Sequence, residues 1–184
     1  PYAEGDIDRP LRILPKQLVK LEAEELMPIY TIERKLMPIL LGMRRRGVRI
    51  VLPVDALVAP DLESPTGRAV GVREIPADQM GLDIGPRTVE GFAAALRGAR
   101  TIIWNGPMGV FEKPPFAGGT LAVARAVAES GAFSVIGGGD TIAAVAKAGV
   151  TARIGYISTA GGAFLAFLEG RTLPGVEALT EAPA

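Results

Sequence analysis

The chain has 184 residues, 48 % of them apolar, with 20 basic and 20 acidic side chains and neither Cys nor His. This length and apolar content suffice for a compact domain with a hydrophobic core. A net charge of zero argues against a surface for nucleic acid or anionic membranes. Without Cys and His, disulfides, thiolate or imidazole catalysis and the usual zinc sites are excluded, which leaves carboxylates, Lys, Arg, hydroxyls and the backbone.

The first 46 residues contain only two of the 23 glycines, and their Leu, Ile and Met residues recur at helical spacing. This pattern predicts a helical segment, which Pro38 should kink. Arg44-Arg45-Arg46 followed by Gly47 is typical of a cationic helix end closed by a glycine cap. A basic cluster that binds phosphate is the alternative interpretation of the three arginines.

The sequence contains no uninterrupted apolar run of about 18 residues, so no transmembrane helix is predicted. Residues 1–6 show neither the basic nor the apolar region of a signal peptide. The first residue is Pro rather than Met, which leaves open a processed, excised or engineered piece. The expected compartment is the cytoplasm, and no membrane or nucleic-acid partner is expected.

From Gly47 onward, apolar runs alternate with helical patterns. The first apolar run is 48–52, residues 55–68 are expected as a polar excursion, residues 69–75 as a returning strand and residues 80–86 as a tight turn. Further strands are predicted at 100–104, 133–136 and 154–158, and helices at 86–96, 120–129, 141–147 and 163–168. This alternation predicts a three-layer, Rossmann-like α/β domain with a mostly parallel sheet and helices on both faces. The predicted division is a helical segment, 1–46, and an α/β domain, 47–184.

Three predicted strand exits are rich in glycine: residues 104–112, 136–141 and 158–163. Glycine lets the backbone approach a ligand closely and adopt positive φ. The last two loops lead directly into helices, whose N-termini offer free N–H groups and a partial positive charge. Two such helix ends beside each other at the carboxyl edge of a parallel sheet predict an anion site, most naturally for phosphate.

Two carboxylates in these loops have two interpretations each. Asp140 is either the N-cap of the following helix or a carboxylate that reaches phosphate through Mg²⁺. Glu112 is either a solvated loop residue or an acceptor for ribose hydroxyls. None of the loops has the spacing of a P-loop or of a dinucleotide fingerprint, which argues against a nicotinamide oxidoreductase.

The loops at 80–88, 104–112, 136–141 and 157–162, in this order and spacing, resemble the phosphoglycerate kinase family. Residues 47–55, 167–170 and 173–176 fit the same pattern. The resemblance covers about residues 47–180 and corresponds to the later part of the family's C-terminal, nucleotide-binding domain, so the domain is incomplete relative to the family. It implies reversible phosphoryl transfer between 1,3-bisphosphoglycerate and ADP, giving 3-phosphoglycerate and ATP, with Mg²⁺.

The resemblance also implies which residues surround the nucleotide. The adenine pocket would be lined by Gly81 and Leu82 with Val110 nearby, and Glu112 would accept the ribose hydroxyls. The residues implied near the phosphates and sugar are Asn105, Gly106, Pro107, Gly137, Gly138, Gly139 and Thr141, with Thr141 opening the helix beneath them. Asp140 would hold the metal, and Gly161 and Gly162 would face the transferring phosphoryl group.

Four positions depart from the family pattern. Ala160 stands where the final loop usually has Gly, Phe164 replaces a small polar residue, Ala166 an expected Glu and Tyr156 a usual His. The family's substrate domain, which holds the 3-phosphoglycerate site, and the lysines on its preceding strands have no counterpart in these residues.

We therefore expect this chain to bind a Mg-nucleotide with little turnover by itself. The alternative is a non-catalytic module, an excised or designed half-domain whose exposed sheet edge and apolar face favour a homo-oligomer or a partner chain.

Overall fold

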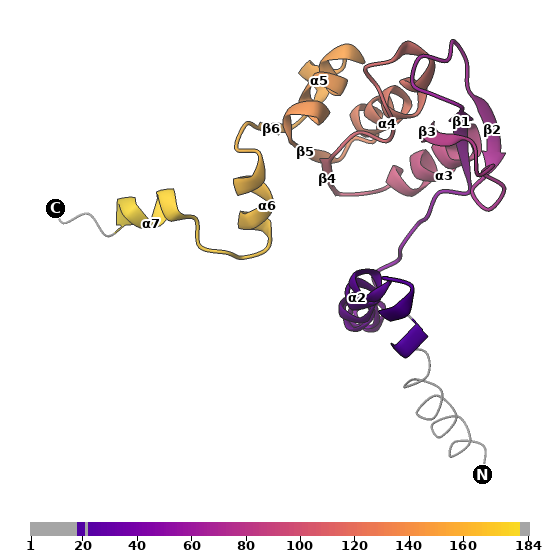
Figure 1. Ribbon diagram of the computed structural model, residues 1–184. Helices are drawn as coiled ribbons and strands as arrows, with labels where there is room; N and C mark the ends of the chain where they lie inside the picture. The colour runs from indigo at the N-terminus through magenta and orange to yellow at the C-terminus, as the bar shows by residue number, and fades with distance from the viewer. Residues whose placement is uncertain (1–17, 21, 181–184) are drawn as a thin grey trace. The chain divides into compact units, whose positions relative to one another are not determined.

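The computed structural model describes residues 18–20 and 22–180, and the chain divides into two units, residues 1–50 and 51–184. The strands are β1 (Asp55–Ala59), β2 (Arg68–Gly71), β3 (Met80–Ile84), β4 (Thr101–Asn105), β5 (Phe133–Gly137) and β6 (Tyr156–Ser158) (Figure 1). The α-helices are α2 (Met27–Arg45), α3 (Pro86–Leu96), α4 (Gly118–Glu129), α5 (Gly139–Lys147), α6 (Gly162–Leu168) and α7 (Pro174–Thr180), and the 3-10 turns are Pro114–Phe116 and Thr151–Arg153. A search of the described ranges finds no helix with the length and hydropathy needed to span a membrane.

The first unit contains α2, which continues through Pro38. Gly47 follows the helix with a φ of +75°, and its N–H donates to the carbonyl of Arg44 at 3.0 Å. The N–H of Val48 donates to the carbonyl of Met43, also at 3.0 Å. These two hydrogen bonds satisfy carbonyls of the last turn and confirm the predicted glycine cap. Leu21, which belongs to the predicted helical pattern, lies outside the described residues.

An antiparallel sheet of three strands, sheet A, was not predicted. Its central strand is β1, which pairs with β2 on one side and with β3 on the other. The predictions of a polar excursion over 55–68 and of a turn over 80–86 are therefore wrong, because β1 and β3 begin inside them. Sheet A includes a polar residue, Asp55, that is nevertheless buried. The hydrogen-bond partner of Asp55 is Thr88, which is distant in the sequence.

Asp55 is held by the first turn of α3. Its carboxylate accepts hydrogen bonds from the backbone N–H groups of Thr88 at 2.8 Å and Arg87 at 3.1 Å, and from the Thr88 hydroxyl at 2.6 Å. Burial by itself would raise the pKa of Asp55, but these hydrogen bonds, first those from Thr88, outweigh it and lower the pKa. Gly85, the N-cap of α3, has no side chain to supply these contacts. Asp55 therefore caps α3 from another strand, which fastens this helix to sheet A.

A second sheet, sheet B, consists of β4, β5 and β6 in parallel, with β5 in the centre. These strands and helices α3 to α6 confirm the α/β prediction, with bounds shifted by at most a few residues. Side chains of α3, α4 and α5 pack against one face of sheet B around Ile102, Trp104 and Ile136. At about 25 cal/mol per Å² of buried apolar area, this cluster is a major source of the second unit's stability.

The opposite face of sheet B carries exposed apolar side chains. Ile103, Phe133 and Tyr156, one from each strand, are all more than half exposed. The apolar run 48–52 forms no strand, and its side chains are also exposed. An open apolar face of this kind is typical of a sheet that packs against further structure or against a partner.

Candidate functional site

The three predicted glycine-rich loops begin at one row of sheet B. Asn105, Gly137 and Ser158 are the last residues of β4, β5 and β6, and they are in register with one another. Because the strands are parallel, all three chains leave the sheet at the same carboxyl edge. The tertiary structure thus brings together loops separated by about 30 and about 20 residues, as the sequence analysis predicted.

The loop after β4 is held in place by two buried hydroxyls. Gly106, with a φ of +96°, donates its N–H to the Oγ1 atom of Thr141 at 2.7 Å. The N–H groups of Met108 and Gly109 donate to Oγ1 of Thr120 at 3.0 Å and 3.2 Å. Thr141 and Thr120 are both fully buried. The loop that contains Asn105, Gly106 and Pro107 is therefore rigidly attached to α4 and α5.

Thr141 differs from its predicted position. The helix after β5 begins at Gly139, so Thr141 is its third residue and does not open it. Its hydroxyl oxygen accepts the hydrogen bond from the N–H of Gly106, in the loop after β4. The resemblance implied that Thr141 lies beneath the phosphates but gave no indication that its hydroxyl accepts a hydrogen bond from Gly106, 35 residues earlier.

The start of α5 tests one of the two interpretations of Asp140. The N-cap of α5 is Gly138, with a φ of +88°, and no side chain caps this helix end. The N-cap interpretation of Asp140 is therefore wrong. Asp140 lies in the first turn of α5 and is exposed, and a Cβ at Gly139 would meet no atom within 4 Å. The backbone of this turn and the Asp140 carboxylate are accessible to a ligand.

The residues implied for the base and sugar lie around the 110–112 segment. The N–H of Val110 donates to the carbonyl of Leu82 at 2.8 Å. The side chain of Leu82 is buried with Ala59 and Phe116, and Val110 packs against them. Gly81 and Glu112 are both exposed, so an adenine could contact the Gly81 backbone and the partly buried Val110, whereas the Leu82 side chain belongs to the core.

Lys147 connects the 110–112 segment to α5. The Nζ atom of Lys147, at the end of α5, donates to the carbonyl of Phe111 at 2.6 Å and lies 5.9 Å from the centre of the Phe111 ring. The hydrogen bond and the cation–π contact hold the 110–112 segment against α5.

Asp83 is a buried carboxylate that the sequence analysis did not single out. It accepts a hydrogen bond from the N–H of Gly119 at 2.7 Å. A Cβ at Gly109 would lie 2.6 Å from the Asp83 Cα atom, so only glycine fits there. Burial raises the pKa of Asp83, while hydrogen bonds from Gly119 and Ile84 lower it, and burial dominates. The signal in the sequence was a lone acidic residue inside an apolar strand, which the turn prediction obscured.

Gly161 and Gly162 stand where β6 leads into α6. Gly161 is the N-cap with a φ of +53°, and α6 begins at Gly162. Among the described residues, Glu25 is the only non-glycine with positive φ. Ala160 therefore lies in ordinary backbone, and its methyl group imposes no conformational strain. Phe164, another departure from the family pattern, packs its ring against Gly137.

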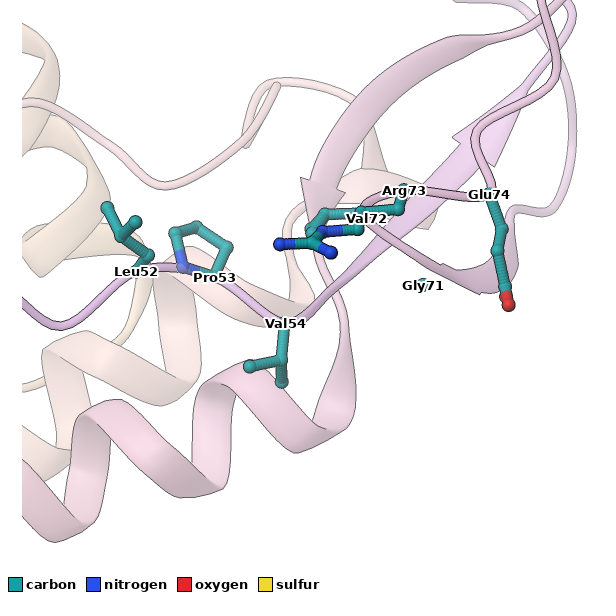
Figure 2. A pocket seen from close by; sticks show the side chains of 7 residues that line it. All are labelled: Leu52, Pro53, Val54, Gly71, Val72, Arg73 and Glu74. Carbon is teal, nitrogen blue, oxygen red and sulfur yellow. The ribbon is translucent and has the colours of Figure 1, made fainter. Parts of the chain in front are cut away.

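A shallow cavity of about 450 Å³ lies away from these loops, between the segment before β1 and the turn after β2. Figure 2 shows its lining residues, which include the charged side chains of Arg73 and Glu74. None of the predicted site residues lines this cavity, so it has no part in the site at the carboxyl edge of sheet B.

Comparison with known proteins gives one consistent result. The model of the phosphoglycerate kinase family matches residues 22–171. The phosphoglycerate kinase of Desulfosudis oleivorans is 60 % identical over 135 residues, which are 73 % of this chain and 34 % of that protein. That of Rubrobacter xylanophilus is 61 % identical over 134 residues, 72 % of this chain and 34 % of that protein.

Solved structures agree with the relatives. The phosphoglycerate kinase structure from Coxiella burnetii has a TM-score of 0.71 at 42 % identity and covers 77 % of this chain and 37 % of that one. The corresponding structure from Pyrococcus horikoshii has a TM-score of 0.63 at 37 % identity, covering 81 % and 39 %. The chain spans about a third of the length of the relatives it matches. Since the family model covers most of these 184 residues, the chain belongs to the phosphoglycerate kinase family.

Proposed function

We propose that this chain binds a magnesium complex of ADP or ATP at the carboxyl edge of sheet B and supplies the nucleotide side of a phosphoglycerate kinase reaction. The observation that supports the proposal is the register of Asn105, Gly137 and Ser158. Because these three residues are in register, the three glycine-rich loops that follow them start at the same edge of sheet B. Phosphoryl transfer depends on positioning and on neutralising charge more than on a general base, so a chain without His or Cys can support it.

In this proposal the backbone of Gly138 and Gly139 donates to the phosphates, and Asn105, Gly106, Pro107 and Gly137 border them. Gly81 and Val110 contact the adenine, and Glu112 accepts the ribose hydroxyls. Gly161 and Gly162 face the transferring phosphoryl group. What supports these roles is that Thr141 and Lys147 attach the loop over residues 104–112 to α5, at Gly106 and at Phe111, so the spacing between this loop and α5 is set before a ligand arrives.

Asp140 is the proposed magnesium ligand. In the part of the chain that the structure describes, no group of three or more acidic, His or Cys side chains converges on a metal site. One exposed carboxylate fits Mg²⁺, which keeps water ligands and is usually shared between a carboxylate and substrate phosphates. When bound, the ion would neutralise phosphate charge during transfer.

Replacing Asp140 with Asn tests this assignment. We expect isothermal titration to show that D140N binds Mg-ADP at least about tenfold more weakly than the unmodified chain, because a neutral amide is a poor magnesium ligand. The matched control is Asp78→Asn, an exposed loop carboxylate, which should leave the affinity unchanged. Equal heats from D140N and the unmodified chain would remove Asp140 from the site.

We further propose that the chain consists of a helical segment, 1–46, and a nucleotide-binding domain, 47–184, and that the protein works in the cytoplasm. No residue of this chain is assigned to 3-phosphoglycerate. A coupled assay with 3-phosphoglycerate and MgATP is therefore expected to show little or no turnover by these 184 residues, and robust turnover would contradict this expectation.

A second candidate function is a non-catalytic module that associates with another chain or with a second copy. The exposed side chains of Ile103, Phe133 and Tyr156 on sheet B favour it, because apolar faces of this kind mark interaction sites. Light scattering that shows a monomer, together with no binding of the dye ANS, would count against this candidate.

A further inference from the structure

The ring of Phe164 lies directly on Gly137. A methyl group built on Gly137 would lie 2.7 Å from Cε1 of Phe164 and 3.2 Å from Nδ2 of Asn105. Carbon atoms in contact are normally about 3.5 to 4.0 Å apart, so the ring fills the space in front of this glycine. While the ring stays there, no ligand atom can contact Gly137 from this side.

The Phe164 ring covers the middle one of the three strand ends from which the glycine-rich loops start. Gly137 lies between Asn105 and Ser158 in the register of sheet B. Its neighbour Ile136 belongs to the core cluster, so the open side of Gly137 is the opposite face of the sheet. The ring thus stands at the edge where the phosphates are proposed to bind.

A cavity adjoins the position of the ring. A mainly apolar cavity of about 270 Å³ lies between β6 and α6, and Phe164 forms part of its wall together with Tyr156, Phe167 and Leu173. A cavity of about 150 Å³ already accepts a benzene molecule in other proteins. Rotation of the Phe164 side chain into this cavity would expose Gly137 and keep the ring in apolar surroundings.

We propose that Phe164 gates the nucleotide site: its ring covers Gly137 in the empty protein and moves into the cavity between β6 and α6 when the phosphates bind. This inference rests on the proposed function. Only molecules whose ring has moved can bind the nucleotide, so the apparent affinity equals the intrinsic affinity multiplied by the fraction of such molecules. Phe164 is in this sense a residue that determines affinity without donating to the ligand.

The first test is Phe164→Ser, which restores a small polar side chain. Isothermal titration with Mg-ADP should show about tenfold tighter binding by F164S, equivalent to about 1.4 kcal/mol and to an open fraction of about one tenth. The control is Leu165→Ser on the same helix, an exposed side chain that does not line the cavity and whose loss should leave the affinity unchanged. If F164S binds no tighter than the unmodified chain, the gate is refuted while nucleotide binding stands.

The second test needs no substitution. In the empty protein the Phe164 ring should shift the NMR signal of the Gly137 α-protons through its ring current, and saturation with Mg-ADP should abolish this shift. A shift that persists at saturation would overturn the gate. If neither the unmodified chain nor F164S binds Mg-ADP at millimolar concentration while both are folded by circular dichroism, the proposed function fails, and the gate fails with it.

Discussion

Replacing Phe116 with Ala is expected to lower the free energy of unfolding by about 3–5 kcal/mol. Phe116 has 0 % exposure and packs with Ala59 and Leu82, and the partly buried Val110 adjoins this cluster. Removing the ring loses its transfer free energy and leaves a cavity, because β1, β3 and the 110–117 segment enclose it from different parts of the chain. Urea unfolding followed by circular dichroism measures the loss.

The control for Phe116→Ala is Phe133→Ala. The Phe133 side chain is 57 % exposed at the start of β5, so its removal should change the free energy of unfolding by less than about 1 kcal/mol. Similar losses in the two variants would show that Phe116 is not enclosed as described. Because Phe116 supports Leu82 and Val110, F116A should also weaken Mg-ADP binding if the adenine lies where we propose.

Replacing Thr88 with Val is expected to cost about 2–4 kcal/mol at neutral pH, because it leaves the buried Asp55 carboxylate short of a donor. The Thr88 hydroxyl donates to Asp55 and accepts from the N–H groups of Val54 and Asp55, each at 3.0 Å. Valine has nearly the same shape but none of these hydrogen bonds. Thr101→Val, at an exposed position that begins β4, is the matched control and should be nearly neutral.

The pH dependence of this loss follows from the lowered pKa of Asp55. A carboxyl whose pKa is lower in the folded state stabilises the fold above its unfolded pKa of about 4, and this contribution is lost as the pH falls through the folded pKa. T88V removes a hydrogen bond that lowers the pKa, so the difference from the unmodified chain should be largest at neutral pH and shrink in acid. A difference independent of pH between 7 and 3 would contradict the account of Asp55.

Asp83 adds an opposite pH dependence. Its pKa is raised by burial, so its contribution favours the fold most below its unfolded pKa and is lost as the pH rises through the folded pKa. Asp55 and Asp83 lie on neighbouring strands of sheet A. Their pKa values nevertheless shift in opposite directions. Asp55 accepts hydrogen bonds from two N–H groups of α3 and from a hydroxyl, whereas the hydrogen bonds to Asp83 do not outweigh the effect of its burial.

Much of the second unit could be predicted from local patterns. The helix over residues 86–96 was bounded by Pro86 at its start and by Gly98 after its end, and the structure has the same bounds. The strands of sheet B are short apolar runs between helical patterns, for which periodicity and turn residues are good guides. The glycine-rich loops were recognisable because few other structural roles concentrate glycine at successive strand ends.

Sheet A could not be predicted in the same way. β1 begins with Asp55 and β3 contains Gly81 and Asp83, which local propensities disfavour in strands. Asp55 and Asp83 are accommodated by partners from other elements, Thr88 and Gly119, and Gly81 pairs with Val58 beside a register shift between β1 and β3. Conversely, the run 48–52 has strand-like side chains but no strand partner among the described residues.

The sequence by itself determined the fold class, the family and the set of glycine-rich loops, because these depend on periodicity, on backbone freedom and on motifs that are contiguous in the chain. Only the tertiary structure decided how those loops are used. In the structure, Asn105, Gly137 and Ser158 are in register across sheet B, and the Thr141 hydroxyl accepts a hydrogen bond from Gly106. Gly138, and not Asp140, is the N-cap of α5, and the Phe164 ring packs against Gly137. The register across sheet B, the Thr141 hydrogen bond and the Phe164 contact join residues distant in sequence, which no local pattern encodes, and the cap of α5 follows from the positive φ of Gly138.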